Sequence, residues 1–332
     1  MKQGERTASR SGAILASQKG IALIMVLWAL TILSVIVFSF SLMARTEAYS
    51  VATFRAVVAN RFLAEAGIER GIMEVLYRNA NRGQNVVLEG REIVKVDGRP
   101  YSGKIGKGEY TFRITDESGK IPLNTLTDGS GILLKNLIIN MGYPPEDADT
   151  VLDSVLDWRD QDEVHRLHGA ESDYYMSLST PYKAKNRDFD TVEELLLVKG
   201  VTPAMLYGDG TRKGIINYLT VHSTTTTINV NGAPKEVLLA IPGMIPEKVD
   251  NILTQRAATG IQSIQDLAGV LGETLPAVSA YLSADDSSVF SVGATGNREG
   301  GQKGYAIRAI VTIEGTTGYR YLYYKSPAQV EP

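Results

Sequence analysis

The chain has 332 residues, of which 44% are hydrophobic and 21% are charged, so most of it can bury a core and a wholly disordered chain is excluded. It contains no cysteine, which excludes disulfide scaffolds, cysteine-ligated zinc or iron–sulfur sites and thiol nucleophiles. The formal net charge of −3 gives no overall basic excess, so binding of nucleic acid would need a local basic patch.

An uncharged apolar segment runs from Ile21 to Ala44. At about 1.5 Å per residue, a helix of this length can cross a bilayer with some tilt. A buried helix of a soluble protein and a cleaved secretory signal are the alternatives, but both usually have shorter apolar stretches. The first twenty residues carry four basic side chains and one acidic one. The positive-inside rule therefore predicts a cytoplasmic N-terminus, with the bulk of the chain on the far side of the membrane, which in a Gram-negative cell is the periplasm.

The start of this segment resembles a type IV prepilin-like signal, because Lys19 and Gly20 stand directly before Ile21. The resemblance implies that a prepilin peptidase cuts after Gly20 and leaves Ile21 as the first residue. Met25 then stands at the fifth position, where most such proteins have Glu. A carboxylate in hydrocarbon costs about 2.5–3.5 kcal/mol and needs a partner, which in pilin-like filaments is the N-terminal amine of the preceding subunit. A subunit with Met25 needs no preceding subunit, which favours one that starts the filament; the alternative is that Met25 is an ordinary lipid-facing residue.

After Arg45 the sequence becomes amphipathic, with apolar residues at steps of three and four. This stripe consists of Val51, Phe54, Val58, Phe62, Ile68, Ile72, Val75 and Leu76. It predicts one long helix, half of it in lipid and half packed on a globular domain, that ends at residues 81–83.

Strand patterns stand at both ends of the rest of the chain. They cover residues 108–115, 290–292, 305–313 and 319–324. Helix patterns lie between them, at 132–141, 145–157, 192–198, 234–240, 246–257 and 264–271. We therefore expect an α+β protein in which one antiparallel sheet is interrupted by a large, all-helical insert at residues 124–285.

Residues 193–203 and 236–246 of this insert repeat one pattern: a short helix, a glycine hairpin, and a second helix opened by proline. These are helix-hairpin-helix-like units, which often bind DNA through a Gly-hydrophobic-Gly hairpin whose backbone approaches a phosphate. Thr202 and Ile245 replace the second glycine. The substitutions favour a structural hairpin, and a membrane-anchored DNA-uptake protein is the alternative reading.

The segment from Glu146 to Asp173 contains ten carboxylates against two arginines. Within it, Asp157, Asp160 and Asp162 follow a predicted helix end, and Glu171 lies close behind. Such closely spaced hard oxygen ligands suit Ca²⁺, although the spacing is not that of an EF-hand. The alternative is a solvated acidic loop without a metal. We take these four residues as candidate calcium ligands on charge density.

His165 and His168 have the spacing of two zinc ligands on a helix, and His222 is the third histidine of the chain. A zinc hydrolase also needs a third ligand and an open coordination position, so a polar surface role is favoured for the pair. The sequence contains no serine-hydrolase elbow, Walker A loop or dinucleotide-binding fingerprint. We expect a protein that is not an enzyme.

Four segments in a fixed order carry a resemblance over nearly the whole chain. They are the prepilin-like N-terminus without an acidic fifth residue, residues 116–124, residues 157–162 with 169–175 behind them, and residues 228–234. Together they resemble the general secretion pathway protein K family, the large minor pseudopilins of type II secretion systems.

The resemblance implies a pilin-like fold, with a long N-terminal helix on the sheet and a helical insert. It implies a single-pass inner-membrane protein at the tip of a periplasmic pseudopilus that exports folded proteins across the outer membrane. The implied partners are two other minor pseudopilins, the major pseudopilin, the inner-membrane secretion platform and the prepilin peptidase. Family members bind calcium, which agrees with the candidate ligands.

These readings divide the chain into five parts. They are a leader at 1–20, a transmembrane helix at 21–44, the first part of a pilin-like domain at 45–123, the insert at 124–285, and the C-terminal strands of the pilin-like domain at 286–332.

Overall fold

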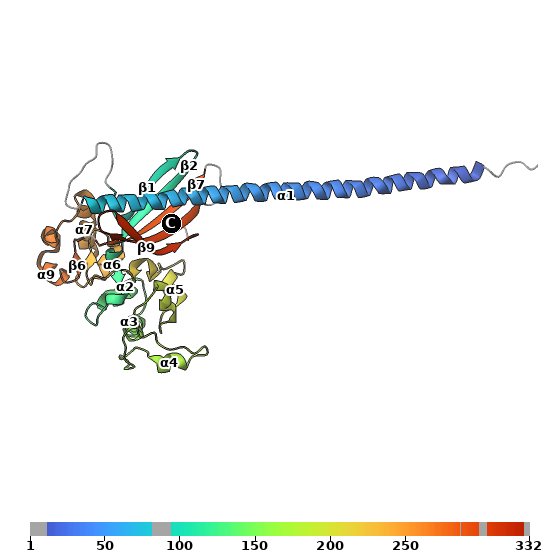
Figure 1. Ribbon diagram of the computed structural model, residues 1–332. Coiled ribbons are helices and arrows are strands. Elements are labelled where there is room, and N and C mark those ends of the chain that lie inside the picture. Colours follow the sequence, from blue (N-terminus) through green and yellow to red (C-terminus); the bar gives the residue numbers. More distant parts are fainter. Residues whose placement is uncertain (1–11, 82–93, 286, 299–303, 329–332) are drawn as a thin grey trace, which may run out of the picture. The chain divides into compact units, whose positions relative to one another are not determined.

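The computed structural model describes residues 12–81, 94–285, 287–298 and 304–328, with side chains from residue 20 onward (Figure 1). The chain forms two compact units, Met1–Ala59 and Asn60–Pro332, which are described separately.

The first unit is helical. Helix α1 (Gly12–Ala80) begins here and continues into the second unit without a break. From Gly20 to Arg55 every side chain in this unit is exposed, including the large apolar ones, such as Leu27 and Phe40. The helix is long and apolar enough to cross a membrane by length and composition. An apolar surface of this extent is stable only against lipid or other helices.

The second unit contains a five-stranded antiparallel sheet with the strand order β1-β2-β7-β8-β9. The strands are β1 (Asp97–Ile105), β2 (Gly108–Asp116), β7 (Val289–Arg298), β8 (Tyr305–Glu314) and β9 (Gly318–Lys325). Strands from both ends of the chain thus form one sheet, and the chain leaves it after β2 and returns at β7. This confirms the α+β fold with an insert; the boundaries at 123/124 and 285/286 stay predictions.

The C-terminal part of α1 lies across this sheet (Figure 1). Its buried face contributes Ala64, Ile68, Ile72 and Val75 to a core shared with the inward side chains of β2, β7 and β8. Two glycines allow the close approach: a Cβ at Gly67 would lie 2.8 Å from Cβ of Ala294, and one at Gly71 would lie 2.5 Å from Cγ1 of Val292.

The predicted apolar stripe of α1 is wrong in its first half. Phe62 is 64% exposed, and Val51 and Phe54 are exposed as well, whereas Leu63 and Ala64 face the core. For Phe62, which lies in the second unit, the physical reason is that the helix has apolar residues on two faces and the sheet covers only one of them. The predicted helix end is correct, because α1 ends at Ala80.

The insert is built from short helices around a second, separate core. Its α-helices are α2 (Ile132–Asn140), α3 (Pro145–Arg159), α4 (Ser172–Met176), α5 (Pro203–Tyr207), α6 (Lys235–Ala240), α7 (Pro246–Ala258), α8 (Ala268–Leu271) and α9 (Leu275–Val278). Its 3-10 helices are η1 (Glu117–Gly119), η2 (Leu123–Thr125), η3 (Val192–Leu197), η4 (Ile215–Tyr218), η5 (Ile264–Leu267) and η6 (Gly272–Thr274).

The insert departs from the expected all-helical character in two short parallel strand pairs. Strand β3 (Ile121–Pro122) pairs with β4 (Leu219–Thr220), and β5 (Ile228–Asn229) pairs with β6 (Leu282–Ser283). Each pair joins segments that are far apart in sequence, so these strands tie the ends of the insert to its interior.

A buried polar joint connects the sheet to the insert where β2 ends. The carboxylate of Asp116 accepts hydrogen bonds from the backbone N–H and hydroxyl of both Ser118 and Ser287, and from Nδ2 of Asn229 at 2.8 Å. A Cβ at Gly119 would lie 2.5 Å from the backbone of Gly232, so this contact needs glycine. Residues 116–119 and 228–232, two of the segments that carried the family resemblance, therefore meet in this joint.

The joint also contains a buried ion pair between Lys120 Nζ and Glu117 Oε1. Burial raises the pKa of Glu117, but the charge and hydrogen bond of Lys120 outweigh it, so the pKa lies below its ordinary value. Glu117 is thus held ionised by a cation of the chain itself.

Candidate metal centre

Helix α3 positions the acidic residues of the candidate site. Pro145 stands in its first turn with Glu146 and Asp147 behind it, where a missing N–H costs nothing and negative charge is favourable. Arg159, in the last turn, donates to the carbonyl oxygens of Leu123 and Leu126. The helix end is therefore fixed, and so is the direction of its last carboxylates.

Three of the four predicted ligands come together at this end. Carboxylate oxygens of Asp157, Asp160 and Glu171 lie within 4.8 Å of one another. Asp157 and Glu171 are buried, and Asp160 is partly exposed. Asp162 lies outside this group, and its side chain accepts a hydrogen bond from the backbone N–H of Val164 instead.

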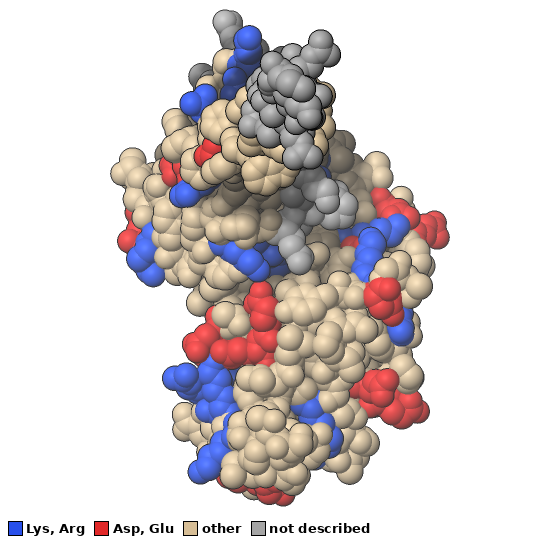
Figure 2. All heavy atoms as spheres, turned by 90° about the vertical axis from the view of Figure 1, so that its right-hand side faces the viewer, with Lys and Arg blue, Asp and Glu red and all other residues tan. Residues whose placement is uncertain are grey.

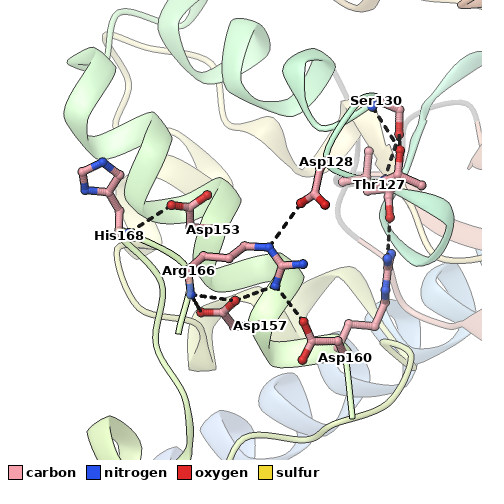
Figure 3. Close-up of polar contacts among 10 residues, drawn as sticks. Thr127, Asp128, Ser130, Asp153, Asp157, Asp160, Arg166 and His168 are labelled. Atoms are coloured by element: carbon pink, nitrogen blue, oxygen red, sulfur yellow. Dashed lines mark hydrogen bonds and ion pairs between the residues drawn. The ribbon is translucent and has the colours of Figure 1, made fainter. Parts of the chain in front are cut away.

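Arg166 reaches into the group from the loop between α3 and α4 (Figure 3). Its Nη1 donates to Asp157 Oδ1 at 2.6 Å and to Asp160 Oδ2 at 2.7 Å, and its Nε donates to Asp128 Oδ1 at 3.3 Å. The guanidinium neutralises part of the negative charge, and the carboxylates in turn hold the pKa of Arg166 above its usual range. Arg166 does not donate to Glu171, because neither carboxylate oxygen of Glu171 has a hydrogen-bond partner.

Several buried oxygens of the site have no hydrogen-bond partner. Both carboxylate oxygens of Glu171 and Oδ1 of Asp160 are in this position. Burial and the charges of Asp157 and Asp160 raise the pKa of Glu171 to about 8. Burial also raises the pKa of Asp157, although Arg166 opposes it. Buried carboxylate oxygens without donors are costly unless a proton or a cation neutralises them.

An aromatic cluster lies close to these carboxylates, since Trp158 follows Asp157 in α3 and the charge of Asp157 acts on Tyr175. The rings of Trp158 and Tyr175 meet edge to face at 5.0 Å, and Tyr175 stacks on Tyr182 at 5.3 Å. Tyr175 is completely buried. Buried aromatic rings lower the local dielectric constant, which strengthens both attraction and repulsion between nearby charges.

The donor set fits a hard cation such as Ca²⁺. Asp157, Asp160 and Glu171 offer oxygen atoms at a spacing that one ion can span, and two of these residues have oxygens without partners. Asn186 lies nearby, because its backbone N–H donates to the carbonyl oxygen of Trp158 and its Nδ2 donates to Glu163. Its φ is 49°, and its Oδ1 is buried without a hydrogen-bond partner. Sequence reasoning missed Asn186, because it lies outside the acidic stretch; an Asn in the left-handed region is visible only in the fold.

The histidines do not form a zinc site in the described parts of the chain. His165 Nε2 lies 2.9 Å from Asp173 Oδ1, and the backbone N–H of His168 donates to Asp153. His222 lines a small cavity with Glu117 and Arg308 in the joint. The group of metal-ligand residues found among residues from 20 onward contains no histidine, so the zinc-hydrolase reading has no support here.

The helix-hairpin-helix-like units are present but are not built for phosphate. Gly200 and Gly243 have φ values of 86° and 83°, as tight hairpins require. The hydroxyl of Thr202 caps α5 by accepting from the N–H of Met205, and the side chain of Ile245 is half exposed at the second hairpin. Figure 2 shows basic side chains scattered among acidic ones on one face, without a continuous basic surface among the described residues there. The DNA-binding alternative is therefore not supported.

The predicted processing residues lie in the first unit. Gly20 and Ile21 are exposed within α1, and Met25 is 60% exposed. The roles predicted for these three residues stay predictions.

Comparison with known proteins points to one family. Two family models match the chain, both described as type II secretion system (T2SS) protein K, over residues 119–207 and 228–292. Both lie mainly in the insert, and they include the acidic site and part of the joint.

Curated relatives carry the same description. Type II secretion system protein K of Pseudomonas aeruginosa is 28% identical over 166 residues, which is 48% of either chain. That of Klebsiella pneumoniae is 26% identical over 267 residues, covering 74% of this chain and 78% of the relative. The match thus spans about half the length of the first relative and more than three quarters of the second.

A solved structure has a similar fold. It is the crystal structure of the GspK-GspI-GspJ complex from the type 2 secretion system of enterotoxigenic Escherichia coli. The TM-score is 0.62 at 16% identity, covering 86% of this chain and all of that one. At this identity the likeness establishes the fold.

Proposed function

Since the chain belongs to the type II secretion system protein K family, we propose that it is a minor pseudopilin, a non-enzymatic subunit of the periplasmic filament of that system. The observation that carries the proposal is the continuity of α1: an apolar helix that can cross a membrane runs unbroken into the helix that packs on the sheet. In a subunit built this way, one helix supplies both the membrane anchor and part of the core of the globular domain.

We place the chain in the inner membrane with a single span, a cytoplasmic N-terminus and a periplasmic globular part. The basic residues before Ile21 support this orientation. Cleavage after Gly20 by the prepilin peptidase would leave a mature protein that starts at Ile21. The exposed apolar surface of α1 supports lateral packing with other helices in the membrane or filament.

The chain occupies the tip of the filament and starts its assembly. Met25 supports this position, because an uncharged residue there needs no N-terminal amine from a preceding subunit. The similar solved structure is a complex of three proteins, and we propose that this chain likewise joins two other minor pseudopilins. The major pseudopilin then adds below, and the inner-membrane platform drives growth for export of folded proteins.

We further propose that the candidate metal centre binds Ca²⁺, held by Asp157, Asp160 and Glu171 with Asn186 as an additional oxygen donor. A bound calcium ion would supply positive charge to buried carboxylate oxygens that otherwise lack partners. In that state Glu171 gives up its proton and the loop that carries Arg166 stays fixed on α3. The ion therefore has a structural role, at the end of α3 in the first half of the insert.

Two experiments on the full-length chain test the proposal. The N-terminal sequence of the protein isolated from cells should begin at Ile21; an uncut leader in working secretion systems would contradict the processing step. The second is replacement of Met25 by Glu, with Met25→Gln as the uncharged polar control. Met25→Glu should allow the subunit to enter the shaft or should disturb initiation, whereas Met25→Gln should initiate filaments normally.

A further inference from the structure

A second polar site lies on the face of the sheet that is turned away from α1. There the sheet and the insert enclose a cleft of about 290 Å³, whose lining includes residues of β2, β7 and β8 and, from the insert, Lys120 and Tyr218. Its volume lies just below the range of about 300–1,000 Å³ that is typical of small-ligand sites. None of the candidate calcium ligands lines it.

The floor of the cleft is a row of three residues on neighbouring strands. Arg113 on β2 is paired with Gly293 on β7, and Gly293 is paired with Arg308 on β8. Paired residues of antiparallel strands point to the same side, so both arginines flank the glycine on this face. Their Cα atoms are roughly 10 Å apart, as two strand spacings require. A Cβ built on Gly293 would meet nothing within 4 Å, so the space between the arginines is open.

The charge of this lining is positive. The lining contains three basic residues, Arg113, Arg308 and Lys120. Asp97 is its only acidic residue among the described parts of the chain. Asp97 is already paired with Arg99, and Lys120 with Glu117. Arg113 and Arg308 also interact with other groups of this chain. The candidate site is therefore defined by their positions on either side of Gly293.

An unsatisfied hydroxyl lies on the same lining. Ser291, the next residue of β7 on this face, is only 6% exposed, and its Oγ has no hydrogen-bond partner. A buried hydroxyl without a partner costs free energy, and a ligand oxygen in the cleft would remove that cost. The unpartnered hydroxyl of Ser291 is evidence that does not depend on the arginines. It too suggests a ligand that carries a hydrogen-bond acceptor.

We propose that this cleft binds carboxylate groups of a ligand between Arg113 and Arg308, over Gly293. Guanidinium groups pair with carboxylates through two parallel hydrogen bonds, which gives both affinity and orientation. The carboxylates can come from an acidic segment of a protein partner or from a free dicarboxylate. Neither source is part of the calcium site or of the membrane helix.

Calorimetric titration of the full-length chain in uncharged detergent, at about 50 mM salt so that screening stays moderate, tests the proposal. One probe is an acidic hexapeptide of Asp and Glu with blocked ends, and the other is succinate. Saturable binding of either probe is expected. Tighter binding of the peptide by tenfold or more identifies a protein segment as the ligand, and equal or tighter binding of succinate identifies a small acid.

Arg113→Ala and Arg308→Ala should each weaken binding at least tenfold, and Arg308→Lys should recover part of the loss. The control is Arg320→Ala on β9, which removes an exposed arginine paired with Glu314 and should change nothing. A lysine hexapeptide should not bind.

A steric variant keeps the test decisive even if the arginine variants fold poorly. Gly293→Leu places a side chain in the open space between the arginines and keeps both arginines, and the φ of Gly293 is not in the left-handed region. It should abolish binding at an unchanged melting temperature. Gly269→Leu is the matched control, because a Cβ there also meets nothing within 4 Å and the residue lies in α8. Absence of saturable binding to both probes, or equal binding by Gly293→Leu and the wild type, overturns the proposal.

Discussion

Two groups of buried carboxylates in the second unit differ in how their charge is met. In the joint, Asp116 accepts hydrogen bonds from Ser118, Asn229 and Ser287, and Glu117 is paired with Lys120. In the candidate metal centre, Glu171 is as deeply buried but neither of its oxygens has a donor.

The pKa values of Glu117 and Glu171 differ because only Glu117 has a cation beside it. Burial raises both, but Lys120 brings the pKa of Glu117 below its ordinary value, while Asp157 and Asp160 push that of Glu171 further up, to about 8. We call the network of the joint closed, because the chain supplies donors to its carboxylates, and that of the candidate metal centre open, because both oxygens of Glu171 lack a donor. Both groups lie in segments that carry the family resemblance, so a shared motif alone does not separate the two roles.

The largest expected effect comes from opening the closed network. Lys120→Met leaves Glu117 buried without its cation, which should lower the free energy of unfolding by about 3–5 kcal/mol. Urea denaturation of the full-length chain measures this. Adding Glu117→Gln should restore part of the loss, and Lys213→Met, which breaks an exposed pair with Glu236, should cost less than about 1 kcal/mol. Equal losses in the free energy of unfolding from Lys120→Met and Lys213→Met would show that the buried ion pair of the joint contributes no more to stability than the exposed pair does.

Filling the open network should stabilise the protein. Calcium at one hundred times its dissociation constant should add about 2.7 kcal/mol to the free energy of unfolding, and a chelator should remove it. Asp160→Asn should abolish most of this gain because it removes a ligand charge. If a chelator leaves the unfolding curve of the calcium-loaded wild type unchanged, the proposed difference between the two carboxylate networks is contradicted.

The pH dependence of stability should have an unusual sign in the chelated protein. Folded Glu171 keeps its proton up to about pH 8, whereas the unfolded chain releases it near the ordinary value of 4.5. The folded state therefore binds more protons between these values, and this residue lowers stability as pH rises, by on the order of 1–3 kcal/mol after solvent screening.

Glu171→Gln should remove that slope and should be more stable than the wild type at pH 8 with chelator. With saturating calcium the order should reverse, because calcium binding needs the deprotonated carboxylate. Parallel pH profiles for the two proteins in chelator would contradict the assignment of the open network to Glu171.

The smallest effect is expected at Asp162. Its side chain lies outside the group of three carboxylates and binds the N–H of Val164. Asp162→Asn should therefore change the calcium-dependent gain in stability by less than about 0.5 kcal/mol. A loss as large as that of Asp160→Asn would place Asp162 among the ligands after all.

Regular patterns made much of the fold predictable. The strands at both ends of the chain alternate in polarity, and the helices at 132–140, 145–159 and 246–258 have clear apolar faces or an opening proline. Strand β1 was not predictable, because Asp97–Ile105 contains glycines and a proline and takes its conformation from pairing with β2. Phe62 was misplaced because a helix with two apolar faces does not reveal which one the sheet covers.

The candidate site was predictable only in part. Charge density identified Asp157, Asp160 and Glu171, but it could not exclude Asp162, since spacing along the chain does not fix the direction of a side chain after a helix ends. Arg166 and Asn186 act through folded contacts, and their neighbours in sequence give no sign of it. The joint joins Asp116 to Asn229, a pair that only tertiary structure brings together.

The position of this chain in the filament is the central functional claim. Immunogold labelling of sheared pseudopili, with an antibody against the insert, tests it most directly. A single label at one end of each filament is the predicted result. Labels spaced along the shaft would contradict a tip subunit that starts assembly.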